Sequence, residues 1–208
     1  MTTPPRLAPL LEQFEFARER LLNRLTGPLV DSGNGTEVPV GPLTDAELLW
    51  EPVPGCWSVR RHRDGPGPRA TLLVGAGAWG RDTTPPPHPE PAPFTTIAWR
   101  LNHLTEMFTL RTDHTAGSRS LNRDDFRCQG EAAPALADLA RSSAAWHAML
   151  GTLDDAALDT VGYCTYPHGG DPELPLLDVV WWMNQELLHH GAEIALLRDL
   201  HRARGEAG

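Results

Sequence analysis

His103, Glu186 and His190 are the side chains whose types and spacing could do chemistry in this sequence. Glu186 and His190 are four residues apart, so on a helix they share one face, with β-carbons roughly 6 Å apart, and could hold one ion together. A metal needs a third ligand, which His103 could supply from a second helix. Two imidazoles and a carboxylate can bind Zn²⁺, Ni²⁺ or Fe²⁺ and leave positions open for water or substrate, as catalytic sites require.

The same residues also have an interpretation without a metal. A buried glutamate four residues from a histidine can simply form a hydrogen-bonded pair. His189 would point about 100° away from its neighbour, and His114 would lie about 16 Å along the helix from His103, so neither is expected to share an ion. Ligating histidines also need acceptors that fix their tautomers. Four side chains nearby in the sequence could serve: Asn102, Glu106, Asn184 and Glu193.

Two long amphipathic stretches would position the three residues. Residues 176–204 contain no proline and a single glycine, and their apolar residues recur close to the 3.6-residue period of a helix face turned to a core. These residues are Val179, Trp182, Met183, Leu187, Ile194, Leu197 and Leu200. The second stretch carries His103. It is expected to begin after Phe94, with Thr95 or Thr96 as N-cap, and to run to about Thr112.

Periodicity and capping residues predict further helical segments over residues 7–25, 44–49 and 134–150. Only the middle one is short. Four long amphipathic helices, with an insertion between the first and the second, predict an all-α four-helix bundle. The chain of 208 residues fits one domain, residues 1–208.

The insertion, about residues 56–93, is expected to be a long loop or a small β-hairpin. Residues 57–62 and 70–74 could pair as its two strands. The glycine-rich run at residues 75–80 lacks the spacing of a phosphate-binding loop. Residues 85–93 are proline-rich and predict a stiff connector. We expect the insertion to cover one end of the bundle or to extend a dimer interface.

Composition narrows the choice of partners and compartment. The formal net charge is -9 and the pI about 5.4, and such an acidic surface repels phosphate backbones, so no nucleic-acid partner is expected. No apolar run approaches the ~20 residues that span a bilayer, and the N-terminus lacks the pattern of a secretion signal. A cytoplasmic protein is therefore expected. Cys56, Cys128 and Cys164 are far apart and without CxxC spacing, as is typical of reduced thiols.

Four motifs resemble the DinB-like (YfiT-like) superfamily over nearly the whole chain. They are Trp50-Glu51-Pro52, Trp57-Ser58-Val59, residues 97–104 and, most specifically, residues 189–200. The resemblance implies a four-helix bundle that is commonly a homodimer. It also implies a divalent metal held by three histidines, one in the second long helix and two spaced four apart in the last.

Transferred to this chain, the first of those histidines corresponds to His103 and the last to His190. The middle position is Glu186, where the resemblance implies a histidine. A carboxylate can ligate, so a site with two histidines and one glutamate remains chemically sound. The departure leaves two other readings open: a site that has lapsed, or one that prefers a harder ion.

The resemblance further implies thiol-dependent chemistry on a small-molecule substrate. Some relatives are maleylpyruvate-type isomerases that use mycothiol, and others transfer bacillithiol or a similar low-molecular-weight thiol. The first hypothesis is therefore a metal-dependent thiol S-transferase or isomerase, with Zn²⁺ or Ni²⁺ favoured and Fe²⁺ next. Two alternatives stay open: a non-catalytic bundle that binds a ligand or partner, and a metal-dependent hydrolase that acts through bound water. No residue is assigned a catalytic or thiol-binding role.

Overall fold

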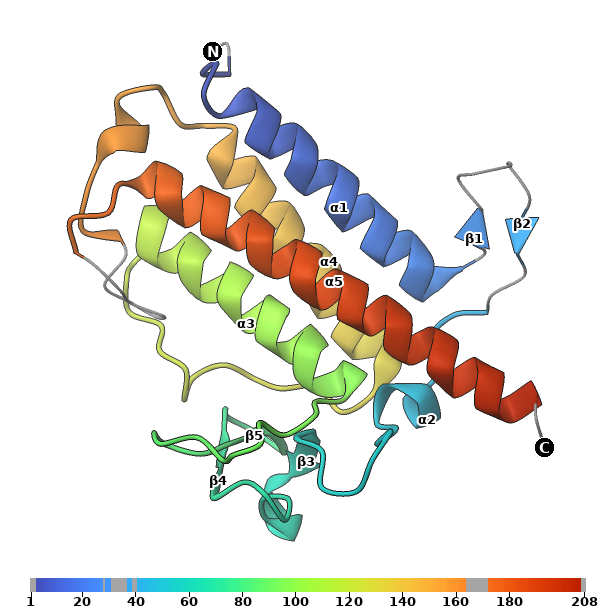
Figure 1. Ribbon diagram of the computed structural model, residues 1–208. Helices are drawn as coiled ribbons and strands as arrows, with labels where there is room; N and C mark the ends of the chain where they lie inside the picture. The colour runs from blue at the N-terminus through green and yellow to red at the C-terminus, as the bar shows by residue number, and fades with distance from the viewer. Residues whose placement is uncertain (1–2, 28, 31–36, 39–40, 164–171, 207–208) are drawn as a thin grey trace.

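The chain is predominantly helical, as predicted, and four long helices lie together (Figure 1). The computed structural model describes residues 3–27, 29–30, 37–38, 41–163 and 172–206. The long helices are α1 (Ala8–Thr26), α3 (Ile97–Ala116), α4 (Ala132–Leu150) and α5 (Leu176–Glu206). Helix α1 contacts α4 and α5, and α3 contacts the same two helices, so the four surround a common core.

Capping residues set several helix ends where the sequence predicts them. The hydroxyl of Thr96 accepts a hydrogen bond from the backbone N–H of Trp99 at 3.2 Å, which selects Thr96 rather than Thr95 as the N-cap of α3. Thr44 likewise caps the short helix α2 (Asp45–Leu48). Helix α1 ends at Gly27, whose φ of 57° suits glycine. Two 3₁₀ turns, η1 (His62–Asp64) and η2 (Ala157–Asp159), complete the helical elements described.

The core lies between the four long helices and is built from aromatic and aliphatic side chains. Phe14 of α1 packs edge-to-face on Phe108 of α3, with ring centroids 5.6 Å apart, and Trp146 of α4 is fully buried. Leu200, predicted to face the core, is exposed instead. Its end of α5 extends beyond the other long helices (Figure 1), so none of those three helices covers Leu200. No helix in the described part of the chain combines the length and apolar character needed to cross a bilayer.

The insertion contains a three-stranded antiparallel sheet rather than the predicted long loop or small β-hairpin. Its strands are β3 (Val59–Arg61), β4 (Leu72–Val74) and β5 (Trp79–Thr83), in the order β3-β5-β4. The predicted direct pairing of residues 57–62 with 70–74 is therefore wrong, because β5 lies between them. Gly75 and Gly77, with φ of 116° and 88°, let the chain turn back after β4. A separate ribbon pairs β1 (Leu29–Val30) with β2 (Glu37–Val38).

A single buried carboxylate holds the insertion sheet together. Asp82 of β5 is fully buried and accepts hydrogen bonds from the backbone N–H groups of Ser58 at 2.9 Å and Gly67 at 2.8 Å. The same carboxylate pairs with the Nε of Arg60 at 2.8 Å. Asp82 thus ties together the start of β3, the loop before β4 and the central strand.

Replacing Asp82 should destabilise the protein because it leaves buried donors without an acceptor. We expect Asp82→Ala to lower the free energy of unfolding by about 3 kcal/mol, measured by urea denaturation. The matched control is Asp64→Ala, since within the described residues Asp64 forms a single, exposed ion pair, with Arg63 at 3.6 Å. That change should stay within about 0.5 kcal/mol of wild type. Equal losses in the two variants would contradict the role given to Asp82.

Candidate metal centre

The structure brings His103 of α3 against Glu186 and His190 of α5. The Nε2 atoms of His103 and His190 lie 3.4 Å and 3.2 Å from the same oxygen, Oε2 of Glu186. The two imidazole rings are edge-to-face, with centroids 4.9 Å apart. One donor atom from each residue falls within 4.8 Å of the others, which is close enough for a single ion to reach all three. The fold thus brings together the three side chains that the sequence singled out.

Solvent can reach this cluster. The side chains of His103, Glu186 and His190 are 15%, 19% and 17% exposed, respectively. They come from helices whose neighbouring positions, such as Leu104 and Leu187, are buried in the core. The cluster therefore lies at the edge of the packed interior, where a small molecule could approach it.

Burial and hydrogen bonding set the protonation states of His103 and Glu186. Burial lowers the pKa of His103 to about 4, although the hydrogen bond with Glu186 acts in the opposite direction, so the ring is neutral near pH 7. Hydrogen bonds from His103 and His190 hold the pKa of Glu186 well below its usual range, so this carboxyl is ionised. A neutral imidazole and a carboxylate both offer lone pairs to a divalent ion.

An outer carboxylate orients His190. The Nδ1 of His190 lies 2.7 Å from Oε2 of Glu193, and Arg100 of α3 pairs with the same carboxylate. Because arginine can only donate, Glu193 is the acceptor that both groups share. Nδ1 of His190 thus faces Glu193 and Arg100, and Nε2 is the nitrogen that faces Glu186. This arrangement matches the carboxylate–histidine pairing found behind metal ligands.

The other side chains considered as outer partners lie elsewhere. Asn102 bonds the backbone of Gln129, Asn184 bonds the carbonyl of Leu10, and Glu106 pairs with Arg81 and Arg123. His189 is exposed, and the ring of His114 bonds the carbonyl of Leu121, so neither joins the cluster.

Sequence reasoning missed the residues that pack around the cluster. Trp99 stacks on His103, with ring centroids 5.2 Å apart and planes 29° apart. Trp99 and Arg100 precede His103 by four and three residues, so helical spacing could have found both. Arg81 contacts Trp99 from the insertion sheet, and nothing in its sequence spacing relates it to α3.

The donor set fits a divalent ion. Two imidazole nitrogens and one carboxylate oxygen converge, and these are ligand types that Zn²⁺ and neighbouring transition metals accept. Three protein ligands also leave room for a further ligand, as catalytic sites require.

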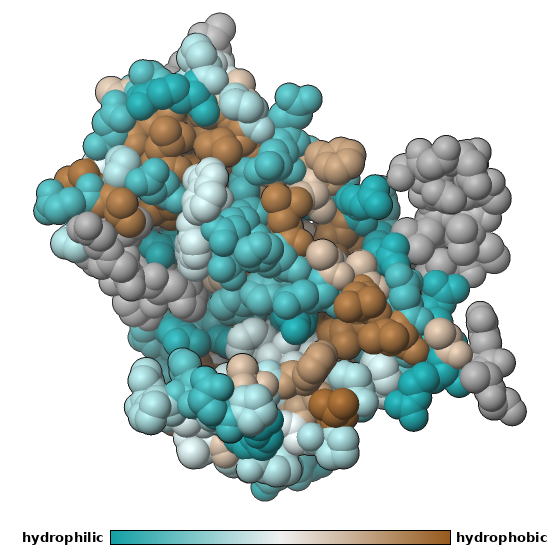
Figure 2. Space-filling model, viewed as in Figure 1, coloured by the Kyte–Doolittle hydropathy of each residue, from teal (hydrophilic) through white to brown (hydrophobic). Residues whose placement is uncertain are grey.

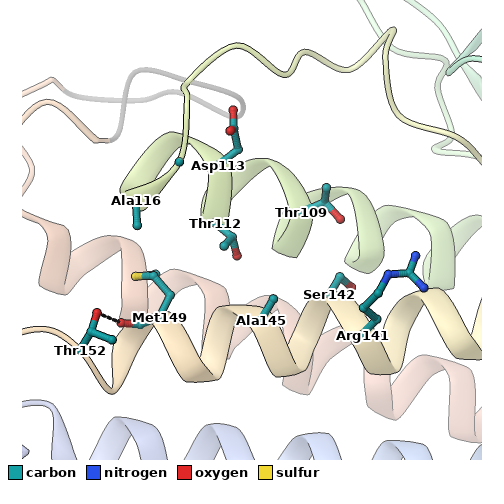
Figure 3. A pocket seen from close by; sticks show the side chains of 10 residues that line it. Thr109, Thr112, Asp113, Ala116, Arg141, Ser142, Ala145, Met149 and Thr152 are labelled. Carbon is teal, nitrogen blue, oxygen red and sulfur yellow. Dashed lines mark hydrogen bonds between the residues drawn. The ribbon is translucent and has the colours of Figure 1, made fainter.

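A separate hollow of ≈ 670 Å³ lies between α3 and α4 (Figure 3). Thr109, Thr112 and Asp113 line it on the α3 side, with Ala145 and Met149 opposite on α4. The carboxylate of Asp113 is occupied by hydrogen bonds from the residues that follow α3, including the backbone N–H of Ser118 at 2.9 Å. This hollow is lined by none of the three cluster residues.

The chain combines a predominantly helical fold with a histidine–glutamate cluster between two of its long helices, α3 and α5. The DinB superfamily matches over residues 75–194, more than half of the chain, so this chain belongs to the DinB superfamily. The match includes β5 and all three cluster residues, which confirms the family resemblance, whereas α1 and the motifs at Trp50 and Trp57 lie before it. The chain matches no curated protein and no solved structure.

The described cysteines are not suited to act as nucleophiles. Cys56 and Cys128 are both buried free thiols, and burial raises the pKa of each, that of Cys128 to about 12. A thiolate is the reactive form, and it is scarce when the pKa is that high. Cys164 lies outside the described residues. The chemistry of the site therefore cannot draw on Cys56 or Cys128.

Native Cys128 should resist alkylation. With a pKa of about 12, only about one thiol in 10⁴ is ionised at pH 8, and the side chain is also shielded from the reagent. We expect iodoacetamide to modify Cys128 much more slowly in folded protein than in urea, as followed by peptide mass spectrometry. Similar rates under the two conditions would contradict the burial of this thiol.

Proposed function

We propose that this chain is a metal-dependent enzyme in which His103, Glu186 and His190 hold a divalent ion. The observation that carries the proposal is the convergence of the three donor atoms within 4.8 Å at a position that solvent reaches. The proposal includes a single domain over residues 1–208 with the four-helix bundle of the DinB superfamily. A cytoplasmic location is proposed as well, since the free thiols of Cys56 and Cys128 suit a reducing compartment.

Transfer of a small thiol is the reaction we propose for the site. A divalent ion bound there would lower the pKa of a coordinated thiol or water and so supply a nucleophile at neutral pH. The family resemblance implies that the thiol is a small molecule such as mycothiol or bacillithiol, and the buried Cys56 and Cys128, with their raised pKa values, offer no competing thiolate. Glu193 holds the imidazole of His190, and Trp99 packs on His103, so the chain itself supplies oriented ligands.

Metal-dependent hydrolysis is a second candidate, favoured by the donor set. Two histidines and one glutamate are the protein ligands of several hydrolytic zinc enzymes, in which water takes the open position. In this chain a glutamate occupies the position where the resemblance implies a third histidine. Zn²⁺, Ni²⁺ and Fe²⁺ are all compatible with these ligands.

Metal analysis of the purified protein tests the site. We expect protein prepared without added metal to carry close to one equivalent of a divalent ion, measured by mass spectrometry of the elements. His190→Ala and Glu186→Ala should lose most of this metal because each removes a ligand. His189→Ala is the matched control, since His189 is an exposed neighbour on the same helix, and it should keep the metal. Wild-type protein that binds none of Zn²⁺, Ni²⁺ and Fe²⁺ would contradict the metal site. The three residues would then be a hydrogen-bonded cluster in a non-catalytic bundle.

Turnover assays then separate the two reactions. Metal-dependent consumption of mycothiol, bacillithiol or glutathione in the presence of electrophiles would support thiol transfer. Metal-dependent cleavage of esters or amides without any thiol would support hydrolysis instead. A metal-loaded protein with neither activity would favour a ligand-binding bundle.

We also propose that the protein is a homodimer formed through the face of α1 and α5. The α1–α5 face carries apolar patches (Figure 2), and its exposed residues Phe16, Leu188 and Leu196 border a hollow of ≈ 470 Å³. Small residues such as Gly191 and Ala192 line this hollow. Projections beside a hollow allow two copies to pack by a two-fold axis, as most homodimers do.

Leu196→Glu should therefore produce a monomer, because it places a charge at the centre of the proposed contact. The control is Leu121→Glu, since Leu121 is also exposed but lies in the loop after α3. Size-exclusion chromatography with light scattering measures the mass of each. A monomeric wild type, or a Leu196→Glu variant that remains dimeric, would contradict this interface.

A further inference from the structure

Three contacts from the insertion hold Trp99 of α3. Its indole Nε1 donates a hydrogen bond of 2.8 Å to the backbone carbonyl of Asp82. The guanidinium carbon of Arg81 lies 4.7 Å from the centroid of its ring, a cation–π contact. The ring of Trp57 packs nearby, with centroids 6.2 Å apart and planes 31° apart. The insertion thus holds the indole of Trp99 on one side.

Trp99 also touches both histidines of the candidate metal centre. It stacks on His103 at a centroid distance of 5.2 Å and meets His190 edge-on at 6.5 Å. An imidazole packed against an immobile indole has fewer rotamers open to it, and so less freedom to lose when it binds an ion.

Arg81 is itself fixed by a buried ion pair. It pairs with Glu106 of α3, and the side chains of both residues are almost fully buried. The other oxygen of Glu106 accepts from the Nε of Arg123 at 3.2 Å. Glu106 lies three residues after His103, and Trp99 lies four residues before His103. Because Arg81 contacts both, it bridges the turns of α3 on either side of His103. The central strand β5 is thereby docked onto the part of α3 that carries the candidate ligand.

We propose that the insertion sheet is a working part of the candidate metal centre, and that Trp99 is a positioning residue for His103. β5 fixes the indole through the carbonyl of Asp82 and the guanidinium of Arg81, and the indole holds the imidazole facing Glu186. This inference rests on the function proposed above. Outer groups that orient metal ligands typically account for 10- to 100-fold in metal affinity.

Substitution of Trp99 tests the inference through metal affinity, measured by competition with a chelating dye. Trp99→Leu removes the stacking surface and should weaken Zn²⁺ binding about tenfold or more. Trp99→Phe keeps an aromatic face for His103 and Arg81 but loses the N–H bond to Asp82 and part of the ring area, so it should recover part of the affinity. Circular dichroism and the melting temperature of the metal-free variants show whether each has kept its fold.

Trp79 provides the matched control. Trp79 lies in β5 of the insertion sheet, is partly buried, and makes a cation–π contact with Arg61 at 4.3 Å. It packs over Gly130 rather than over the histidines. Trp79→Leu should leave Zn²⁺ affinity within about twofold of wild type, even if it lowers the melting temperature. Equal losses of affinity in the two leucine variants would mean a general effect on stability and would overturn the positioning role.

A spectroscopic signature separates positioning from stability. Titration with Co²⁺ or Cu²⁺ should quench part of the tryptophan emission of wild type, because an indole stacked on His103 lies next to any ion the cluster holds. The quenching should be lost in Trp99→Phe and kept in Trp79→Phe. Quenching that persists unchanged in Trp99→Phe would mean that the ion binds away from this indole and would overturn the positioning role.

The outcomes separate the two proposals. If wild type binds Zn²⁺ and His190→Ala does not, but Trp99→Leu binds as tightly as wild type, only the positioning role is overturned. If wild type binds no divalent ion, the proposed function fails and the positioning role fails with it. Loss of affinity in Trp99→Leu, recovery in Trp99→Phe and no change in Trp79→Leu would establish the role.

Discussion

The close packing of α3 against α5 is the constraint on which the rest of the structure depends. Side chains reach only a few ångströms from their backbone, so His103 can share an oxygen of Glu186 only where the two helices are in contact. Nothing within either helix could create this arrangement. The apolar core that joins the helices, including Leu104 and Leu187, therefore determines the geometry of a polar cluster at its edge.

Charged groups near that core are tolerated because each has a partner. Arg81 of β5 pairs with Glu106 of α3, and near the C-terminal end of α5 the buried Arg198 pairs with Glu47 at 2.6 Å. Breaking such pairs by removing one member is strongly destabilising, because it leaves a charge buried alone. In this chain they also join elements that are far apart in sequence. The first docks the insertion on α3, and the second docks α2 on α5.

The sequence predicted the elements that obey a simple period and missed those set by packing. The four long helices and the spacing of Glu186 and His190 follow from the 3.6-residue repeat. Strand β5 was missed because Trp-Gly-Arg-Asp-Thr has no apolar alternation, and its buried side chains, Arg81 and Asp82, are both charged. The outer carboxylates show a different limit. Glu106 and Glu193 each follow a histidine of the cluster by three residues. Glu193 contacts its histidine, whereas Glu106 pairs with Arg81 instead, and only the folded chain shows this difference.

The cluster joins residues 83 positions apart in the chain, and this separation links ion binding to folding. An unfolded chain does not hold His103 near Glu186, so an ion that bridges them binds the folded state in preference. By mass action, free ion at a hundred times its dissociation constant would add roughly 2.7 kcal/mol to the stability of the fold. The concentration of free metal around the protein would then set how long the protein survives heat and proteases.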